Sequence, residues 1–216
     1  MNDAGARRPI ATRNAAWAQA FARWLASTSV TPNQISIASI VAAAIAGGAF
    51  WISAHASPGV RIALLIVAAL GCQVRLICNL LDGLVAIESG KRAADGAFWN
   101  EFPDRISDIF IIVGLGLGAG APTLAWAAAS LAVLTAYTRE LGQNCGAPAD
   151  FSGPMAKPHR MALVTIASLG AIAEQMMGGG VMILTAALWI LAVGAAITTA
   201  LRAMRIVKVL RGDGQR

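Results

Sequence analysis

The chain has 216 residues, enough for one domain, and 57% of them are hydrophobic while only 13% are charged. The mean hydropathy is +0.64 and the mass is 22.2 kDa. A soluble globule of this size cannot bury so much apolar surface, so the composition excludes an ordinary soluble protein. It favours a protein whose helices lie in a lipid bilayer.

The formal net charge of +6 would suit a nucleic-acid partner, but the pattern of the basic residues does not. They stand in short polar gaps between apolar runs, where they orient membrane helices and meet anionic lipid headgroups. We therefore expect no nucleic-acid partner. The three cysteines, Cys72, Cys78 and Cys145, lack CxxC spacing, which argues against a disulfide framework or a zinc site.

The N-terminal part of the chain divides into two segments. Residues 1–14 are polar and basic, and we expect them to be disordered. In residues 15–27, Trp17, Phe21 and Trp24 recur at helical spacing. This pattern predicts a short amphipathic helix that lies on the membrane surface.

Thr31 and Pro32 then form a helix-start signal, a capping hydroxyl followed by a proline at the first helical position. Six apolar runs follow, each close to the roughly 20 residues that cross about 30 Å of hydrocarbon. We expect them at about 34–54, 61–82, 97–118, 122–142, 160–177 and 181–201. The predicted fold class is all-α integral membrane, with six transmembrane helices plus the N-terminal surface helix. The predicted membrane domain is 15–207, and a basic cytoplasmic tail is predicted at 208–216.

The distribution of basic residues predicts the orientation in the membrane. With the N-terminus inside, the outer loops hold little beyond Arg61. The inner segments hold Arg7, Arg8, Arg13, Arg23, Lys91, Arg92, Lys157, Arg160, Arg202, Arg205, Lys208, Arg211 and Arg216. Because positive residues stay on the cytoplasmic side, we expect both termini to be cytoplasmic in a cell (inner) membrane protein.

Polar residues concentrate near the cytoplasmic ends of the second and third expected membrane helices. Those of the second share one helix face: Arg75, Asn79 and Asp82. Those of the third form a stripe with a period of four, with a glutamate beside it: Asn100, Asp104, Asp108 and Glu101. A charged side chain deep in the bilayer costs roughly 2.5–3.5 kcal/mol, so these groups are expected to face a polar site that binds something.

Oxygen ligands without His or Cys favour Mg²⁺ or Mn²⁺ over zinc. A purely structural role, in which the carboxylates pair with Arg75 and Arg105, is the alternative for these residues.

At these residues the chain resembles a known family. Asn79-Leu-Leu-Asp82-Gly83-Leu-Val-Ala86, followed by Gly96-Ala-Phe-Trp-Asn100 and Asp104, is similar to the signature of CDP-alcohol phosphotransferases, D-x2-D-G-x2-A-R-x8-G-x3-D-x3-D. The stretch from Thr31 to Ser36 also resembles the start of this family's first membrane helix. Three signature positions differ, because Asn79 and Asn100 replace two of four Asp residues and Ile87 replaces the Arg.

The resemblance implies roles for the matching positions. Asp104 would be the base that deprotonates the acceptor hydroxyl, and the acidic positions would hold one or two Mg²⁺ or Mn²⁺ ions against the pyrophosphate of the lipid donor. The implied metal-binding residues are Asp82, Asp104, Asn79 and Asn100. The implied nucleotide-binding residues are Asn79, Asp82, Gly83, Ala86 and Gly96. Because neutral amides attract a cation less than carboxylates do, we expect Glu101 or Asp108 to be a further metal ligand.

Three basic residues near the same side are candidates for binding the acceptor. Arg139 lies where relatives that use phosphorylated acceptors place an Arg, and Lys157 and Arg160 precede the fifth membrane helix. Arg can grip a phosphate with paired donors, whereas Lys supplies a point charge. Ordinary flanking charge is the alternative for all three.

The resemblance therefore implies an enzyme that transfers a phosphatidyl group from CDP-diacylglycerol to an alcohol, releases CMP and forms a homodimer. Glycerol 3-phosphate and inositol phosphate fit the role of Arg139, and serine or another non-phosphorylated alcohol stays open. One alternative is a non-catalytic relative that binds a nucleotide-lipid. A small cation-coupled transporter is another, but transport predicts polar residues throughout the bundle, and the outer halves are almost wholly apolar.

The glycines at positions 114, 116, 118 and 120 resemble a glycine-rich phosphate loop. They lack the strand–loop–helix setting of such a loop, so we interpret them as packing and turn glycines.

Overall fold

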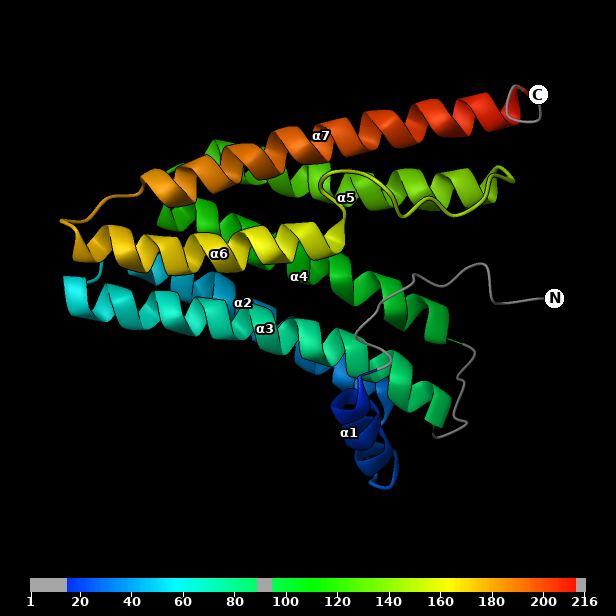
Figure 1. Cartoon of the computed structure of the whole chain (residues 1–216), viewed down its shortest axis with the longest axis horizontal. Helices are drawn as coiled ribbons and strands as arrows, with labels where there is room; N and C mark the ends of the chain where they lie inside the picture. Colours follow the sequence, from blue (N-terminus) through cyan, green and yellow to red (C-terminus); the bar gives the residue numbers. More distant parts are fainter. Residues whose placement is uncertain (1–14, 89–94, 213–216) are drawn as a thin grey trace.

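The computed structural model describes residues 15–88 and 95–212, and these ranges form seven helices. The helices are α1 (Ala16–Ala26), α2 (Pro32–Ser53), α3 (Pro58–Glu88), α4 (Gly96–Gly118), α5 (Pro122–Asn144), α6 (Lys157–Met176) and α7 (Met182–Leu210). Helices α2 to α7 run along the long axis of the molecule, and α1 lies across them (Figure 1). The all-helical prediction is confirmed, whereas the expected disorder of residues 1–14 lies outside the described residues.

Among the described residues, three helices are long and apolar enough to cross a membrane: α2, α3 and α7, with 22, 31 and 29 residues. Helices α4, α5 and α6 have 23, 23 and 20 residues and lie in the same bundle. Helix α4 is less apolar because its first half carries Glu101, Asp104, Arg105 and Asp108. The structure therefore supports an integral membrane protein.

Two helices extend beyond their predicted ends. Helix α3 continues past residue 82 to Glu88, because Leu84 and Val85 are buried in a cluster with Ala18 and Ala22 of α1. Burial of these apolar side chains favours continued helix over a polar loop. Helix α7 ends at Leu210, three residues inside the predicted tail.

The start of α2 has the predicted cap. Thr31 Oγ1 accepts a hydrogen bond from the Gln34 backbone N–H at 3.3 Å, and Gln34 Oε1 accepts one from the Thr31 N–H at 2.9 Å. This reciprocal capping box, with Pro32 in the first turn, fixes where the helix begins. The fixed start places Ser36 one turn into α2, where it contacts Asp82 of α3.

Glycines bring α2 and α4 into backbone contact. A Cβ on Gly47 would lie 2.2 Å from the Phe110 carbonyl oxygen, and one on Gly114 would lie 2.2 Å from that of Gly47. A Cβ on Gly118 would lie 2.4 Å from the Phe50 oxygen. Such close approach is typical of small residues between membrane helices. The interpretation of the 114–120 glycines as packing and turn residues is confirmed, the last having a φ of +71°.

Gly47→Ala is expected to destabilise the protein by about 1–3 kcal/mol, because the added methyl group forces α2 and α4 apart. Gly48→Ala is the matched control, since nothing lies within 4 Å of a Cβ at that position. Thermal unfolding of both purified variants in detergent, followed by tryptophan fluorescence, compares them. Equal melting temperatures would contradict the close packing of the two helices.

Candidate active site

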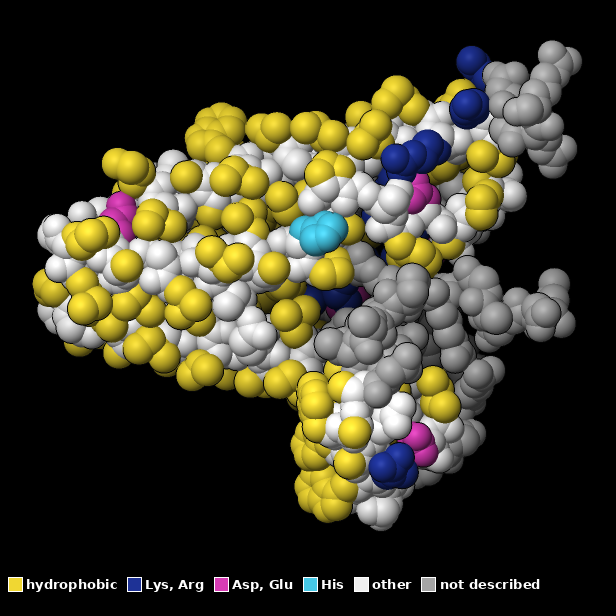
Figure 2. Space-filling view, in the orientation of Figure 1, with side chains coloured by type: hydrophobic (Ala, Val, Ile, Leu, Met, Phe, Trp, Pro, Cys, Tyr) yellow, Lys and Arg dark blue, Asp and Glu magenta, His cyan; other side chains and the backbone are white. Residues whose placement is uncertain are grey.

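Five charged side chains and one amide from three helices meet inside the bundle. They are Arg75 and Asn79 of α3, Asp104 and Asp108 of α4, and Lys157 and Arg160 of α6. The two aspartates and two arginines are at most 4% exposed. Figure 2 shows most of the visible acidic and basic side chains in one half of this face, whereas hydrophobic side chains dominate the other half, where one acidic side chain is visible.

Asp104 is the centre of this network. Its Oδ1 accepts hydrogen bonds from Arg75 Nη2 at 3.1 Å and from Asn79 Nδ2 at 2.8 Å. Its Oδ2 accepts one from Lys157 Nζ, which also donates to Asn79 Oδ1 at 2.6 Å. Asn79, Asp104 and Lys157 thus form a closed triangle of hydrogen bonds that joins α3, α4 and α6.

Asp108 lies one helical turn from Asp104 and is held by two arginines. Its Oδ1 accepts a hydrogen bond from Arg75 Nη2 at 3.1 Å, and its Oδ2 accepts one from Arg160 Nη2 at 2.6 Å. Arg160 also donates to the Met155 carbonyl at 2.9 Å and to Thr135 Oγ1 at 3.2 Å. Both carboxylate oxygens of Asp108 are therefore engaged by positive side chains.

Asp82 differs from the other two aspartates. It is 5% exposed, and its oxygens accept hydrogen bonds from Ser36 Oγ at 2.8 Å and from the Gly83 N–H at 2.6 Å. Within the part of the chain that the structure describes, no basic side chain forms an ion pair with it. It lies close enough to Asp104 and Lys157 to interact with their charges. A buried carboxylate with only neutral partners is costly, so Asp82 is the best candidate here for a cation ligand.

Glu101 belongs to a second, more exposed network. It accepts hydrogen bonds from Arg105 Nη2 and, at 2.5 Å, from Arg139 Nη2. Arg139 also donates to Glu140 Oε1, at 2.9 Å from Nε and 2.6 Å from Nη2, and its guanidinium lies 5.0 Å from the centre of the Phe151 ring. These contacts hold Glu101 toward α5.

The loop between α5 and α6 places Lys157 and Arg160. The Met155 N–H donates to Thr198 Oγ1 of α7 at 2.9 Å, and Gly153 has a φ of +125°. A Cβ at Gly153 would lie 2.4 Å from the Thr198 methyl carbon, so glycine allows the loop to approach α7.

A carboxylate anchors the same loop. Partial burial acts to raise the pKa of Asp150, but hydrogen bonds from Ser152 and Arg205 outweigh it, and the pKa lies below its usual value. Its charged form therefore helps to fix the loop against α7 at neutral pH.

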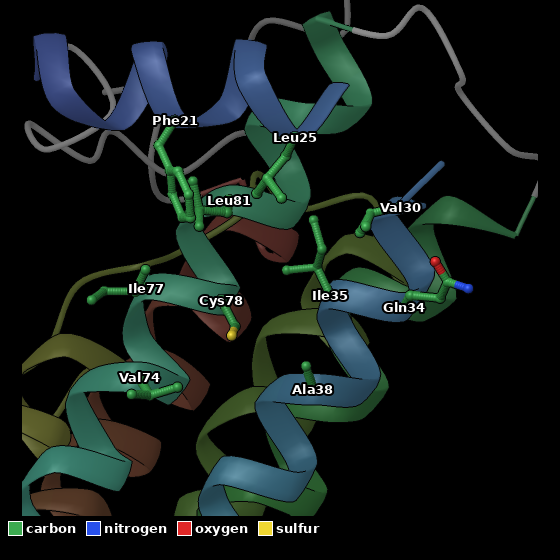
Figure 3. A pocket seen from close by; sticks show the side chains of 10 residues that line it. All are labelled: Phe21, Leu25, Val30, Gln34, Ile35, Ala38, Val74, Ile77, Cys78 and Leu81. Carbon is green, nitrogen blue, oxygen red and sulfur yellow. The ribbon is translucent and has the colours of Figure 1, made fainter. Parts of the chain in front are cut away.

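An apolar pocket of about 390 Å³ lies where α1 crosses α2 and α3 (Figure 3). Phe21 and Leu25 of α1, Ile35 and Ala38 of α2, and Leu81 of α3 are among its lining residues. Ile35 and Leu81 directly precede Ser36 and Asp82 in the sequence. The pocket therefore borders the same pair of helices as the buried Asp82.

The chain is similar to known proteins in sequence and in fold. None of the family models compared with the chain matches it. The archaetidylinositol phosphate synthase of Pyrococcus horikoshii is 28% identical over 150 residues, 67% of this chain and 72% of that protein. The phosphatidylinositol phosphate synthase of Streptomyces avermitilis is 28% identical over 145 residues, 63% of this chain, which spans only 58% of that relative.

The fold is similar to that of the phosphatidylinositol phosphate synthase of Mycobacterium tuberculosis. Its crystal structure with CDP-DAG bound has a TM-score of 0.73 at 21% identity, covering 92% of this chain and 97% of the other. A structure of the same protein in complex with manganese and citrate also has a TM-score of 0.73 at 21% identity and covers 88% of each chain.

The signature residues, the related sequences and the shared fold agree. The chain is similar to CDP-alcohol phosphatidyltransferases in its signature residues, in its sequence relatives and in its fold. The prediction of a family of phospholipid-synthesis transferases is thereby confirmed.

The structure gathers only part of the family signature of this chain in one place. Asn79 contacts Asp104, Asp82 lies three residues after Asn79 on the same face of α3, and Asp108 lies one turn after Asp104 on α4. Asn100 is exposed in the first turns of α4, and the contacts of Glu101 are with arginines. Asp108 pairs with two arginines, which is the arrangement expected of a structural residue.

The predicted nucleotide-binding residues lie on either side of the α3–α4 connection. Gly83 and Ala86 follow Asp82 on α3 and are half-buried, and Gly96 begins α4. A Cβ on Gly96 would meet nothing within 4 Å. Residues 89–94 between them lie outside the described ranges, so nucleotide binding at these positions stays a prediction.

The carboxylates of this chain fit one divalent ion better than two. In residues 15–88 and 95–212, no group of three or more His, Cys, Asp or Glu side chains is arranged to hold a metal ion. Each carboxylate oxygen of Asp104 and Asp108 already accepts a hydrogen bond from a positive side chain. These donors are Arg75 and Lys157 for Asp104, and Arg75 and Arg160 for Asp108. Asp82, with neutral donors only, can accept one ion without displacing a protein cation.

The sequence placed Arg75 on the polar face of the second helix, as an alternative partner of the carboxylates, and the structure pairs it with Asp104 and Asp108. The sequence analysis gave no role to Ser36 or Thr135, although both contact the site. Ser36 and Thr135 are short hydroxyl side chains in apolar helices, and only the packing of the helices shows which carboxylate or guanidinium they meet.

Proposed function

We propose that this protein transfers a phosphatidyl group from CDP-diacylglycerol to an alcohol at the cytoplasmic face of the membrane and releases CMP. The observation that carries the proposal is the contact of Asp104 with Lys157 and Asn79 inside an otherwise apolar bundle, with the buried Asp82 three residues after Asn79 on the same face of α3. Charged groups are retained in such a place when they bind or react with a ligand. The named activities of the sequence relatives support the same reaction class.

Asp104 Oδ2 is the proposed proton acceptor. Oδ1 already accepts two hydrogen bonds, from Arg75 and Asn79, whereas Oδ2 accepts only that of Lys157 and can accept another. The acceptor hydroxyl gives its proton to this oxygen as its own oxygen bonds to the lipid-side phosphorus. The bond from that phosphorus to the CMP oxygen breaks. Lys157, which lies beside Asp104, stabilises the negative charge that develops on the reacting oxygen.

The family uses divalent metal ions, and the M. tuberculosis relative binds manganese in one structure. Asp82 would hold a Mg²⁺ or Mn²⁺ ion here, and the ion would supply positive charge to the pyrophosphate of the donor.

Asp104→Asn is expected to lower the rate of CMP release at least about 100-fold, because an amide cannot take the hydroxyl proton. Glu174→Gln, near the opposite end of α6 from Lys157, is the matched control and should keep wild-type activity. Purified protein is incubated with CDP-diacylglycerol, Mg²⁺ or Mn²⁺ and glycerol 3-phosphate, inositol phosphate or serine. CMP release and lipid products are followed by mass spectrometry.

Near-wild-type turnover of Asp104→Asn would refute the assignment of the base. No CMP release from the wild-type protein with any of these alcohols would instead favour a non-catalytic relative that binds the nucleotide-lipid.

We propose that α2 to α7 all span the membrane and that residues 15–207 form one membrane domain. Helices α4 to α6, with 20 to 23 residues, extend roughly 30–35 Å, which matches the hydrocarbon thickness. Helix α1 would lie in the cytoplasmic surface of the membrane, because Trp17 and Trp24 are 53% and 58% exposed while its alanines pack on α3.

The distribution of basic residues supports an orientation with both termini in the cytoplasm. The family resemblance supports a homodimer.

The apolar pocket is proposed to receive an acyl chain of the lipid donor. It lies between α2 and α3 beside α1, and its lining includes Leu81, the residue before Asp82, so the tails of a lipid with its headgroup at the site would lie there (Figure 3). Apart from Gln34, its lining side chains are apolar or, in the case of Cys78, weakly polar, which suits a hydrocarbon chain (Figure 3).

Ala38→Trp is expected to raise the KM for CDP-diacylglycerol several-fold, about tenfold if the indole fills the pocket, and to leave the acceptor KM unchanged. Ile45→Trp is the matched control, because Ile45 is exposed on the same face of α2 two turns away and does not line the pocket. Kinetics with the donor in mixed detergent micelles distinguish the two. An unchanged donor KM in Ala38→Trp would exclude this pocket from donor binding.

Arg139, Lys157 and Arg160 are proposed to bind the acceptor, with Arg139 holding its phosphate when it has one. Arg139 has two carboxylate partners, Glu101 and Glu140, and a phosphate can replace either as a charged acceptor of its hydrogen bonds. Glycerol 3-phosphate or inositol phosphate are the acceptors that this role favours.

Arg139→Ala is expected to raise the acceptor KM about tenfold or more, because hydrogen bonds to charged groups contribute about 1.5–3 kcal/mol. Arg105→Ala is the control, since Arg105 also pairs with Glu101 but lies one turn away from it on α4 itself. Initial rates are measured against each substrate in turn. If only the donor KM rises in Arg139→Ala, this arginine belongs to the donor site.

A further inference from the structure

Lys157 does not behave as a flanking lysine that extends into solvent. It is the first residue of α6, its side chain is 17% exposed, and its ammonium group points into the bundle. There it contacts one oxygen of Asn79, at 2.6 Å, and one oxygen of Asp104. A cation between oxygen atoms of two side chains has the surroundings that a metal ion has between its ligands.

The amide at position 79 matches this lysine. Asn79 accepts from Lys157 through Oδ1 and donates to Asp104 through Nδ2 at 2.8 Å. A carboxylate at position 79 could not donate to Asp104 and would repel it, so the pair would need a more highly charged ion between them. With an amide, a single positive charge is sufficient.

The charges of the buried cluster also balance before any ion binds. Asp82, Asp104 and Asp108 supply three negative charges, and Arg75, Lys157 and Arg160 supply three positive charges. Two divalent ions would add four positive charges to this neutral group, whereas the diphosphate of a CDP-lipid carries two negative charges. One divalent ion leaves the loaded site neutral, and excess buried charge is strongly unfavourable.

We propose that Lys157 is a resident cation of the active site that stands at Asp104 in place of a second metal ion, so that the protein binds one divalent ion, at Asp82. The inference rests on the proposed function and deepens it, since it states how this chain neutralises a diphosphate donor. It assigns to Lys157 a role beside the reacting oxygen, and it explains the amide at position 79.

The stoichiometry of Mn²⁺ binding to the purified full-length protein tests the proposal without any substrate. Electron paramagnetic resonance of free Mn²⁺, titrated against protein in detergent, is expected to show one strongly bound ion per chain. Asp82→Asn is expected to lose that ion. Two strongly bound ions per wild-type chain, or retention of the ion in Asp82→Asn, would overturn the proposal.

Replacement of the lysine tests its part directly. The double variant Asn79→Asp, Lys157→Met is expected to bind a second Mn²⁺ ion at Asp104. Lys157→Met alone should bind the first ion about tenfold more tightly, because it removes a positive charge that repels an ion at Asp82. Lys208→Met, at an exposed position of α7, is the control and should bind as the wild type does.

Unchanged stoichiometry in a folded double variant would refute the exchange of lysine for metal. If the double variant does not fold, the wild-type stoichiometry still decides the proposal. Failure of CMP release in wild-type protein that binds one ion would count against the proposed function only, because Mn²⁺ binding is measured separately from turnover.

Discussion

The ion pairs between α3, α4 and α6 are the interaction on which the rest of this site depends. Arg75 bridges Asp104 and Asp108, and Arg160 holds the second oxygen of Asp108, all at 4% exposure or less. Bringing these charges out of water is expensive, and the pairing offsets the cost only if every helix keeps its place. The glycine contacts of α2 with α4 therefore matter for chemistry, since they fix the helix that carries both aspartates.

Much of the fold could be predicted because each helix start and each apolar run is a local feature. The capping box at Thr31, the apolar lengths and the packing role of Gly114 and Gly118 all follow from neighbouring residues. The continuation of α3 to Glu88 could not be predicted in the same way. It depends on α1, which buries Leu84 and Val85 from outside the segment.

The same distinction applies to the site. The faces that carry Asn79, Asp82 and Asp104 follow from helical spacing, and the family signature names their roles. Which cation meets which carboxylate depends on how far each helix slides along its neighbours, and spacing within one helix does not contain that information. Asp108 thus pairs with Arg75 and Arg160, and Glu101 with Arg139, although both had been expected near a metal. Their role as metal ligands stays a prediction that these pairings make less favourable.

The arrangement of α2 and α3 suits a reaction on an amphiphilic substrate. Ile35 and Leu81 line the apolar pocket, while the next residues in the sequence, Ser36 and Asp82, bond to each other on the polar side. Successive residues of a helix point about 100° apart, so two adjacent positions can serve hydrocarbon and headgroup at once. The proposed lipid donor needs this adjacency, because its diphosphate and its acyl chains are joined by a short glycerol unit. The helix pair that supplies an uncompensated carboxylate thereby also supplies the apolar surface beside it.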